Sequence, residues 1–132
     1  MTIFSKIVAG EINAHVVAET TEYLAFLDIQ PLAPGHVLVI PKIEVDYIFD
    51  MEEDLYVGLW MFAKIVANGL KEAFPCKKVG VSVIGLEVAH AHIHLIPMNN
   101  VSDMNFSKEK LNPTEEELAD AAEKIKMALL AQ

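Results

Sequence analysis

The stretch His90-Ala91-His92-Ile93-His94-Leu95-Ile96 alternates imidazole with apolar side chains, and the rest of the chain is organised around it. Successive side chains of a β-strand point to opposite faces of the sheet. The alternation therefore predicts a strand with three histidines on one face, whereas Ala91, Ile93 and Leu95 enter the core from the other. Three of the five histidines of the protein lie in this stretch.

A face of three imidazoles supports two kinds of chemistry. In one interpretation, the neutral ring of His92 attacks an electrophile while His90 and His94 orient it and handle protons. In the other, two or three rings bind zinc, which accepts nitrogen ligands in a tetrahedral arrangement. The simplest alternative is a solvated strand face with no chemical role, but three histidines in strict alternation are unusual where they have no function.

Length and composition limit the number of domains and the classes of partner. The length of 132 residues predicts one domain over residues 1–132, large enough for a core. A net charge of −9 argues against nucleic-acid binding, which needs a basic surface. All ten basic residues are lysine, so any phosphate must be held without a guanidinium group, by backbone N–H groups, histidines, hydroxyls or a lysine.

The cysteine count and the hydropathy pattern bear on the compartment. Cys76 is the only cysteine, which excludes an internal disulfide and favours a reducing compartment. The first residues do not resemble a signal peptide, and no stretch approaches the ~20 apolar residues of a membrane span. We therefore expect a cytoplasmic protein that does not associate with a membrane.

Five strands are expected from alternating or continuous apolar stretches bounded by turn residues. They cover residues 15–18, 23–28, 36–40, 79–84 and 88–97. The third of these is apolar after its histidine, which predicts a central strand covered on both faces.

Three helices complete the expected α+β fold, in which the sheet is mainly antiparallel. A short helix over residues 3–9 is closed by Gly10, a long helix ends at Pro75, and a capping box at residues 114–117 opens a C-terminal helix. Gly58 and Gly69 lie inside the long helix, where each lowers helix stability by about 1 kcal/mol relative to alanine. Glycine has no side chain, so we expect close packing at these positions, for example against a second subunit.

Three separated motifs resemble the histidine triad (HIT) family. His90-x-His92-x-His94 matches the motif that names the family, residues 3–12 resemble its N-terminal signature, and residues 26–42 resemble its central segment. Gly85 and Val88 stand where the family has a glycine and a valine. The resemblance covers residues 2–98, whereas residues 99–132 are expected to form a loop and a helix without a family signature.

The resemblance implies a HIT fold with a five-stranded antiparallel sheet, paired into a homodimer through the long helix and an edge strand. It also implies a substrate class, nucleoside monophosphates joined through phosphorus to a leaving group. By position, His92 is the nucleophile that forms a covalent nucleotidyl-histidine. The family places the acceptor that orients this ring at a backbone carbonyl near the third histidine, here His94.

The remaining site residues follow by position from the same resemblance. His90 and His94 would donate to the phosphate or the leaving group, and His36 would support the triad unless it is an ordinary core histidine. Asp28 matches the position that takes the ribose hydroxyls, a task suited to a carboxylate. The apolar residues that match or flank the family's base pocket suit a purine face, although core packing is the competing explanation, above all for Ile7 and Leu27. These residues are Ile3, Phe4, Ile7, Phe26, Leu27 and Ile29.

The chain departs from the family pattern where phosphate donors are expected. Leu86 replaces a glutamine, Glu87 replaces a serine, Met98 replaces an arginine, and Ser82 is the only polar residue where one branch has an asparagine. These changes remove phosphate donors, so they bear on the leaving-group preference and the rate more than on the identity of the nucleophile. Glu87 would repel a polyphosphate tail if it pointed inward.

The favoured function is hydrolysis of purine nucleoside phosphoramidates, the activity of the Hint-like branch, with no cofactor required. Three alternatives stay open: a dinucleoside polyphosphate hydrolase, a nucleotide-binding or partner-binding protein with weak or no catalysis, and a zinc protein. Three neighbouring imidazoles could also take up zinc adventitiously.

Overall fold

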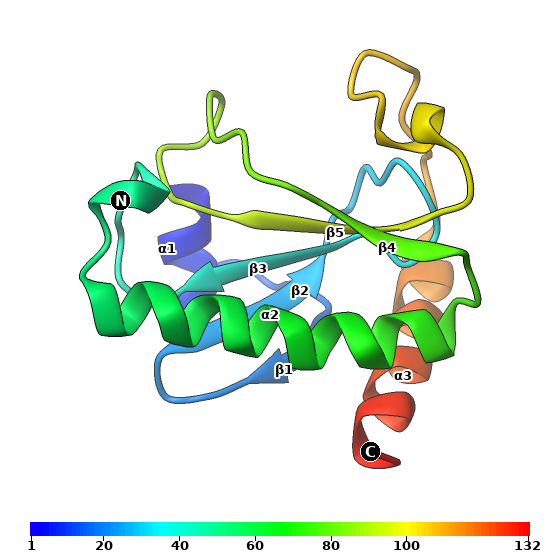
Figure 1. Cartoon of the computed structure of the whole chain (residues 1–132), viewed down its shortest axis with the longest axis horizontal. Coiled ribbons are helices and arrows are strands. Elements are labelled where there is room, and N and C mark those ends of the chain that lie inside the picture. Colours follow the sequence, from blue (N-terminus) through cyan, green and yellow to red (C-terminus); the bar gives the residue numbers. More distant parts are fainter.

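The computed structural model describes all 132 residues and contains one five-stranded antiparallel sheet with the strand order β1-β2-β3-β5-β4 (Figure 1). The strands are β1 (Val16–Glu19), β2 (Tyr23–Leu27), β3 (Val37–Pro41), β4 (Lys78–Ser82) and β5 (Ile93–Met98). The expected α+β class with a five-stranded antiparallel sheet is confirmed.

The central strand β3 is buried along its whole length, as its continuous apolar sequence predicts. It pairs with β2 on one side and with β5 on the other, and this second pairing sets Leu38 opposite His94. Residues opposite one another in a ladder share a face. His94 therefore projects from the same face as Leu38.

Three α-helices divide between the two faces of the sheet: α1 (Ile3–Val8), α2 (Glu53–Ala73) and α3 (Glu115–Leu130). The helices α2 and α3 cover one face, where alternate strand residues such as Val39, Ile93 and Leu95 join the larger core cluster. The short helix α1 covers part of the other face, where Phe4 packs with Phe26 and its neighbours. The histidine face of β5 is therefore the one that α2 and α3 leave free.

The helix ends follow the capping chemistry of the sequence. The Thr2 side chain caps α1, the Glu52 side chain accepts from two N–H groups at the start of α2, and both hydrogen bonds of the predicted capping box are present at Thr114. Pro75 follows the end of α2. None of these helices combines the length and apolar composition that a membrane crossing requires.

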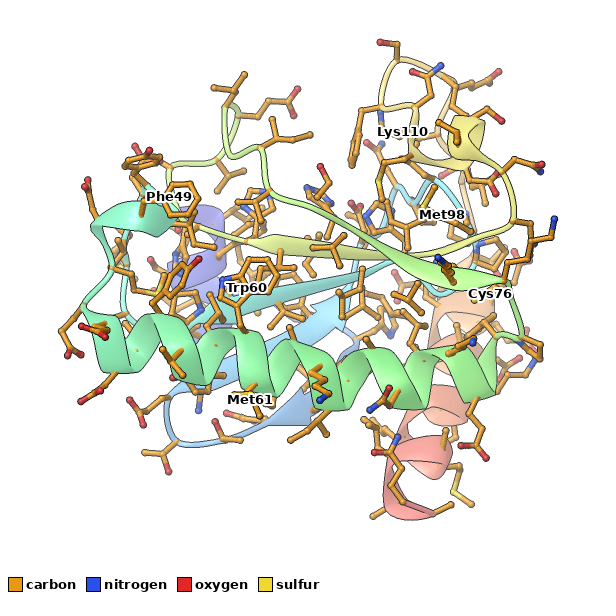
Figure 2. The ribbon with its side chains drawn as sticks, in the orientation of Figure 1. Phe49, Trp60, Met61, Cys76, Met98 and Lys110 are labelled. Carbon is orange, nitrogen blue, oxygen red and sulfur yellow. The ribbon has the colours of Figure 1, made fainter.

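The glycines of α2 pack within the chain. A Cβ atom at Gly58 would collide with the hydroxyl of Tyr23, and one at Gly69 would collide with Leu129 of α3. Close packing at these positions is confirmed, and the neighbouring residues belong to the same chain. The outward side of α2 is occupied by other residues: Figure 2 shows Trp60 on the sheet side of this helix and Met61 on the opposite side.

The predicted histidine strand is too long at its N-terminal end. The strand β5 begins at Ile93, because β4 ends at Ser82, which lies opposite His94, and the pairing with β3 also ends at Ile93. Before that point Ala91 donates its N–H to the carbonyl of Val45, in a loop outside the sheet. His90 therefore lies outside the regular alternation, and the predicted strand at residues 79–84 is likewise two residues too long.

Leu59 is fully buried between α2 and the sheet, so Leu59→Ala leaves a cavity. We expect it to lower the free energy of unfolding by about 2–5 kcal/mol in urea titrations. The matched control is Leu130→Ala, since Leu130 is 81% exposed and the same deletion there should change stability by less than about 0.5 kcal/mol. Equal losses from both variants would contradict this assignment of the core.

Candidate functional site

A cavity of about 530 Å³ lies on the face of the sheet that α2 and α3 leave free. Its wall brings together α1, the end of β2, the segment before the triad, and a loop beyond β5. Most of the sequence-predicted site residues line this cavity, together with two of the positions that depart from the family pattern. Those lining it are Ile3, Phe4, Ile7, Phe26, Leu27, Asp28, Ile29, Leu86, Glu87, His92 and His94.

The ring of His92 is held by the backbone of His90. Its Nδ1 lies 2.7 Å from the carbonyl oxygen of His90. A carbonyl oxygen only accepts, so in the neutral ring Nδ1 carries the proton and Nε2 keeps a free lone pair. The predicted acceptor, a carbonyl near His94, is wrong: the acceptor belongs to the first histidine of the triad, because the bend before β5 turns that carbonyl toward the His92 ring.

His90 does not line the cavity, although the sequence places it among the phosphate donors. Its ring is completely buried, and Nε2 donates to the carbonyl oxygen of Pro41 at 2.8 Å. The other nitrogen, Nδ1, then accepts from the hydroxyl of Thr2 at 3.0 Å. Both ring nitrogens thus have partners within the protein, so His90 has no free N–H group for the cavity.

Thr2 belongs to a small network that sequence reasoning missed. Its backbone N–H donates to Glu44 at 3.0 Å, and the hydroxyl of Ser5 donates to the same carboxylate oxygen. These bonds lower the pKa of Glu44, with the hydroxyl of Ser5 as the largest cause. The network fixes α1 against His90, and α1 in turn holds the ring of Phe4 edge-on to His92, with 5.0 Å between ring centroids.

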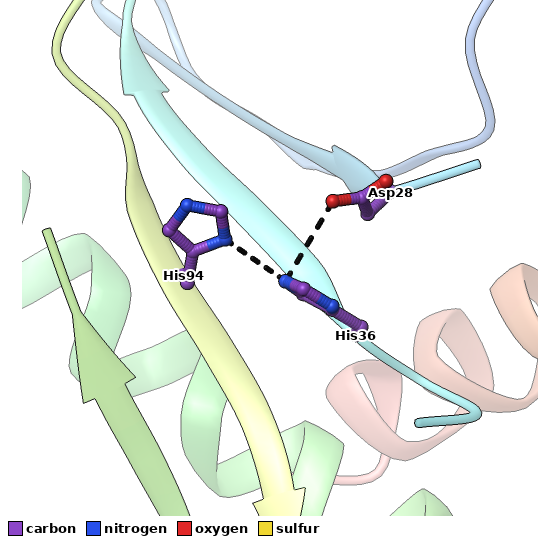
Figure 3. Close-up of side chains that lie close together, drawn as sticks. All are labelled: Asp28, His36 and His94. Atoms are coloured by element: carbon purple, nitrogen blue, oxygen red, sulfur yellow. Dashed lines mark hydrogen bonds and ion pairs between the residues drawn. The ribbon is translucent and has the colours of Figure 1, made fainter. Parts of the chain in front are cut away.

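His36 and His94 form a hydrogen-bonded pair (Figure 3). The backbone N–H of Leu32 donates to Nδ1 of His36 at 3.0 Å, so the proton of the neutral His36 ring lies on Nε2. That atom donates to Nδ1 of His94 at 2.9 Å. The neutral His94 ring therefore carries its own proton on Nε2, which is free to donate to a ligand.

Burial keeps this pair neutral. Desolvation lowers the pKa of His36 to about 3 and that of His94 to about 4, and in each case a neighbouring histidine adds a smaller effect of the same sign. Burial also lowers the pKa of His90, partly offset by its bond to Pro41. All three rings are thus uncharged near neutral pH, and they act there as donors and acceptors in place of cations.

Asp28 directly follows β2 and lines the cavity. One of its oxygens accepts from the N–H of Gln30 at 2.9 Å, and the other lies 3.8 Å from Nε2 of His36. Burial raises the pKa of this carboxyl, and the bond from Gln30 counters it. The second oxygen has no short hydrogen bond, so it can accept from the hydroxyl groups of a ligand.

Asp28, His36 and His94 also offer three possible metal ligands, whose atoms lie within 4.8 Å of one another. A metal ion needs a lone pair on Nε2 of His36, but that atom holds the ring proton because Leu32 occupies Nδ1. Binding would therefore require His36 to lose this proton and its bond to His94. The hydrogen-bond pattern favours a neutral histidine pair over a metal site.

Two site residues, Phe106 and Lys110, come from the segment that carries no family signature. The ring of Phe106 packs edge-on against His94, with 4.8 Å between centroids. No periodicity or turn motif in residues 99–113 marks either residue in the sequence. Ser82, the one polar candidate on β4, does not line the cavity, whereas Glu87 does.

A second cavity of about 450 Å³ lies on the other side of Asp28 and His36. Its wall includes the β2–β3 loop and the N-terminal half of α3, with Phe74 and Lys124 among its residues. Neither His92 nor His94 lines it. His92 and His94 therefore belong to the first cavity alone.

The family assignment agrees with this geometry. The family model of the HIT domain, which describes its sequence pattern, matches residues 9–101, which is most of the chain. The chain belongs to the HIT family. A crystal structure of a HIT-like protein from Bartonella henselae superimposes on this HIT protein with a TM-score of 0.85, at 30% identity, and covers 96% of this chain and 95% of that one.

Two relatives of this HIT protein are similar in sequence. An uncharacterised HIT-like protein of Borreliella burgdorferi is 32% identical and spans 95% of this chain and 96% of its own length. Adenosine 5'-monophosphoramidase HNT1 of Saccharomyces cerevisiae is 36% identical and spans 72% of this chain and 61% of its own length.

The neutral histidines of the HIT site make stability depend on pH. Between pH 6.5 and about 5, unfolded histidines take up protons while His36 and His94 stay neutral in the folded protein, so the free energy of unfolding should decrease as the pH falls. Each such group contributes up to about 1.4 kcal/mol per pH unit. Urea titrations at several pH values measure this slope.

The variant His36→Asn tests the assignment to His36, because its amide oxygen can still accept from Leu32 but the side chain does not titrate. Its slope between pH 6.5 and 5 should be smaller than that of the wild type. Asp28, whose pKa is raised, acts in the opposite direction at lower pH, which sets the lower limit of the window. Identical slopes for the two proteins would contradict the buried neutral state of His36.

Proposed function

We propose that this HIT protein hydrolyses conjugates of purine nucleoside monophosphates at the α-phosphorus, with phosphoramidates as the preferred substrates. The observation that carries the proposal is the free lone pair on Nε2 of His92, created by the bond from Nδ1 to the carbonyl of His90. The name of the yeast relative, adenosine 5'-monophosphoramidase, supports the choice of substrate class.

The nucleoside would bind in the apolar part of the cavity. Phe4 from α1 and Phe26 from β2 form one wall, with 5.4 Å between their ring centroids, and Ile3 and Ile29 remain partly exposed beside them. Such apolar walls suit the faces of a purine. Leu27 belongs to the core cluster on the opposite face, so core packing accounts for it.

Asp28 would bind the ribose. Its free carboxylate oxygen lies at the rim of the same cavity and can accept from both hydroxyl groups of a ribose diol. This contact would direct the 5'-phosphate toward the histidine cluster. The base and the ribose would thus supply binding energy that orients the phosphorus toward His92.

The reaction would proceed in two steps. Nε2 of His92 attacks the phosphorus, a P–N bond to the ring forms, and the bond to the leaving amine breaks as that amine takes up a proton from solvent, which regains one when water attacks in the second step. Water then attacks the nucleotidyl-histidine, which releases the nucleoside monophosphate and restores the neutral ring. The Nε2–H of His94 would stabilise the negative charge that develops on the phosphoryl oxygens.

No metal or cofactor takes part in these steps. The imidazole of His92 supplies the nucleophile, and the Nε2–H of His94 supplies a donor for the phosphoryl group. The activity is therefore expected to survive treatment with a chelator. This expectation separates the proposal from a zinc-dependent function.

The proposal is tested by incubating the protein with adenosine 5'-phosphoramidate and measuring the release of AMP. The wild type should turn over after chelator treatment, and His92→Ala should reduce the rate by at least about 10³-fold because it removes the nucleophile. Thermal unfolding and AMP binding of the variant serve as controls for folding and for the intact pocket.

Equal turnover by His92→Ala would exclude the proposed mechanism. A dinucleoside polyphosphate tested in parallel separates the second hydrolase activity from the first, and Glu87 in the cavity wall predicts slower turnover of this substrate. AMP binding without turnover of either substrate would instead favour a binding protein.

We also propose that two copies of the chain pair through α2 and β4. The strand β4 lies at the edge of the sheet, where its outer backbone groups have no partner strand. The helix α2 exposes an apolar stripe at four-residue spacing: Val57, Met61 and Ile65 are each more than half exposed. Apolar side chains in such a row are typical of a covered helix face.

Ile65→Glu should convert the protein to a monomer, because the charge would lose its hydration in the interface. Sedimentation velocity of the wild type and of the variant measures the mass in solution. Leu130→Glu, which places the same charge on an exposed position of α3, should leave the mass of the wild type unchanged. A monomeric wild type would contradict the pairing.

A further inference from the structure

The charges around the cavity of the proposed site disfavour binding of an anionic nucleotide. Two carboxylates line it, Asp28 and Glu87, and the protein as a whole carries a net charge of −9. Burial lowers the pKa of His94 there and so keeps its ring neutral, and the chain has no arginine. A phosphate would therefore meet hydrogen-bond donors but little positive charge, unless a lysine supplies it.

Lys110 is the only lysine that lines this cavity. It lies in the loop between η2 (Val101–Met104) and α3 (Figure 2). None of the three ion pairs of the protein involves its ammonium group. Its one hydrogen bond runs from Nζ to the carbonyl oxygen of Phe106 at 2.8 Å, so two of its three N–H donors are free.

The loop around Lys110 is held in place at both ends. On one side, the ring of Phe106 packs against His94 and more distantly against His36, with 4.8 and 6.4 Å between centroids. On the other side, the N–H of Leu111 donates to the carbonyl of Pro31 at 2.9 Å. Lys110 is thus fixed between an anchor on the histidine pair and an anchor on the β2–β3 loop.

We infer that Lys110 binds the phosphate group of the nucleotide, as the cation that this chain supplies from its C-terminal segment. The inference rests on the proposed function for the identity of the ligand. Lys110 lines the same cavity as His92 and His94, so an anion there would be within reach of both its ammonium group and the histidine rings. Lys110 would then offset the charge of Asp28 and Glu87.

Calorimetry with AMP and adenosine tests this inference, because the two probes differ only in the phosphate. Lys110→Gln should weaken AMP binding about tenfold, equivalent to about 1.4 kcal/mol for a charge-assisted hydrogen bond, and change adenosine binding by less than about twofold. Lys110→Arg should retain most of the AMP affinity, since it keeps the charge. The loss in Lys110→Gln should shrink at high salt.

Lys108→Gln is the matched control. Lys108 lies in the same loop but does not line the cavity, so this change should alter neither affinity. Two results would overturn the inference: AMP binding by Lys110→Gln equal to that of the wild type, or equal losses for AMP and adenosine, which would mean that Lys110 only supports the loop. A wild type that does not bind AMP would overturn it as well.

Binding is measured without turnover, so this test is separate from that of the hydrolase activity. Failure of the proposed hydrolysis appears only in the AMP-release assay with His92→Ala. Loss of AMP selectivity in Lys110→Gln, in a protein that does not hydrolyse phosphoramidates, would still support the phosphate contact.

Discussion

The hydrogen bond from Nδ1 of His92 to the carbonyl oxygen of His90 is the contact on which the site depends. Because a carbonyl cannot donate, this bond determines the side of the ring that keeps a lone pair. The opposite tautomer would present an N–H to the cavity and no nucleophile. The irregular backbone before Ile93 is what turns the carbonyl toward the ring, so the departure from strand geometry serves the proposed chemistry.

Backbone groups that can only donate or only accept a hydrogen bond also determine the proton positions of His36 and His90. The N–H of Leu32 can only donate to His36, and the carbonyl of Pro41 can only accept from His90. Once the His36 ring is assigned, the donor and acceptor atoms of His94 follow from their hydrogen bond. Burial also lowers the pKa values of His36, His90 and His94. Each ring therefore stays neutral, with a donor at one nitrogen and an acceptor at the other.

The proposed site would accommodate an anion in an acidic chain without arginine. The walls of the cavity are largely apolar, the histidines contribute directed hydrogen bonds, and the single lysine comes from outside the motif-bearing part of the chain. Phe106 joins the two parts, since it packs on His94 and also carries the carbonyl that holds Lys110. The C-terminal segment therefore completes a pocket whose other walls come from the motif-bearing residues.

Local periodicity was sufficient to predict the five strands, the long helix, the capping box at Thr114 and the core face of Ile93 and Leu95, because each depends on neighbours in the sequence. The family motif likewise pointed to His92. Only the tertiary structure decided the direction of the His90 ring, the proton positions of the buried histidines and the place of Lys110 in the cavity. Those features depend on contacts between segments far apart in the chain, such as Thr2 with His90, and no pattern of adjacent residues encodes them.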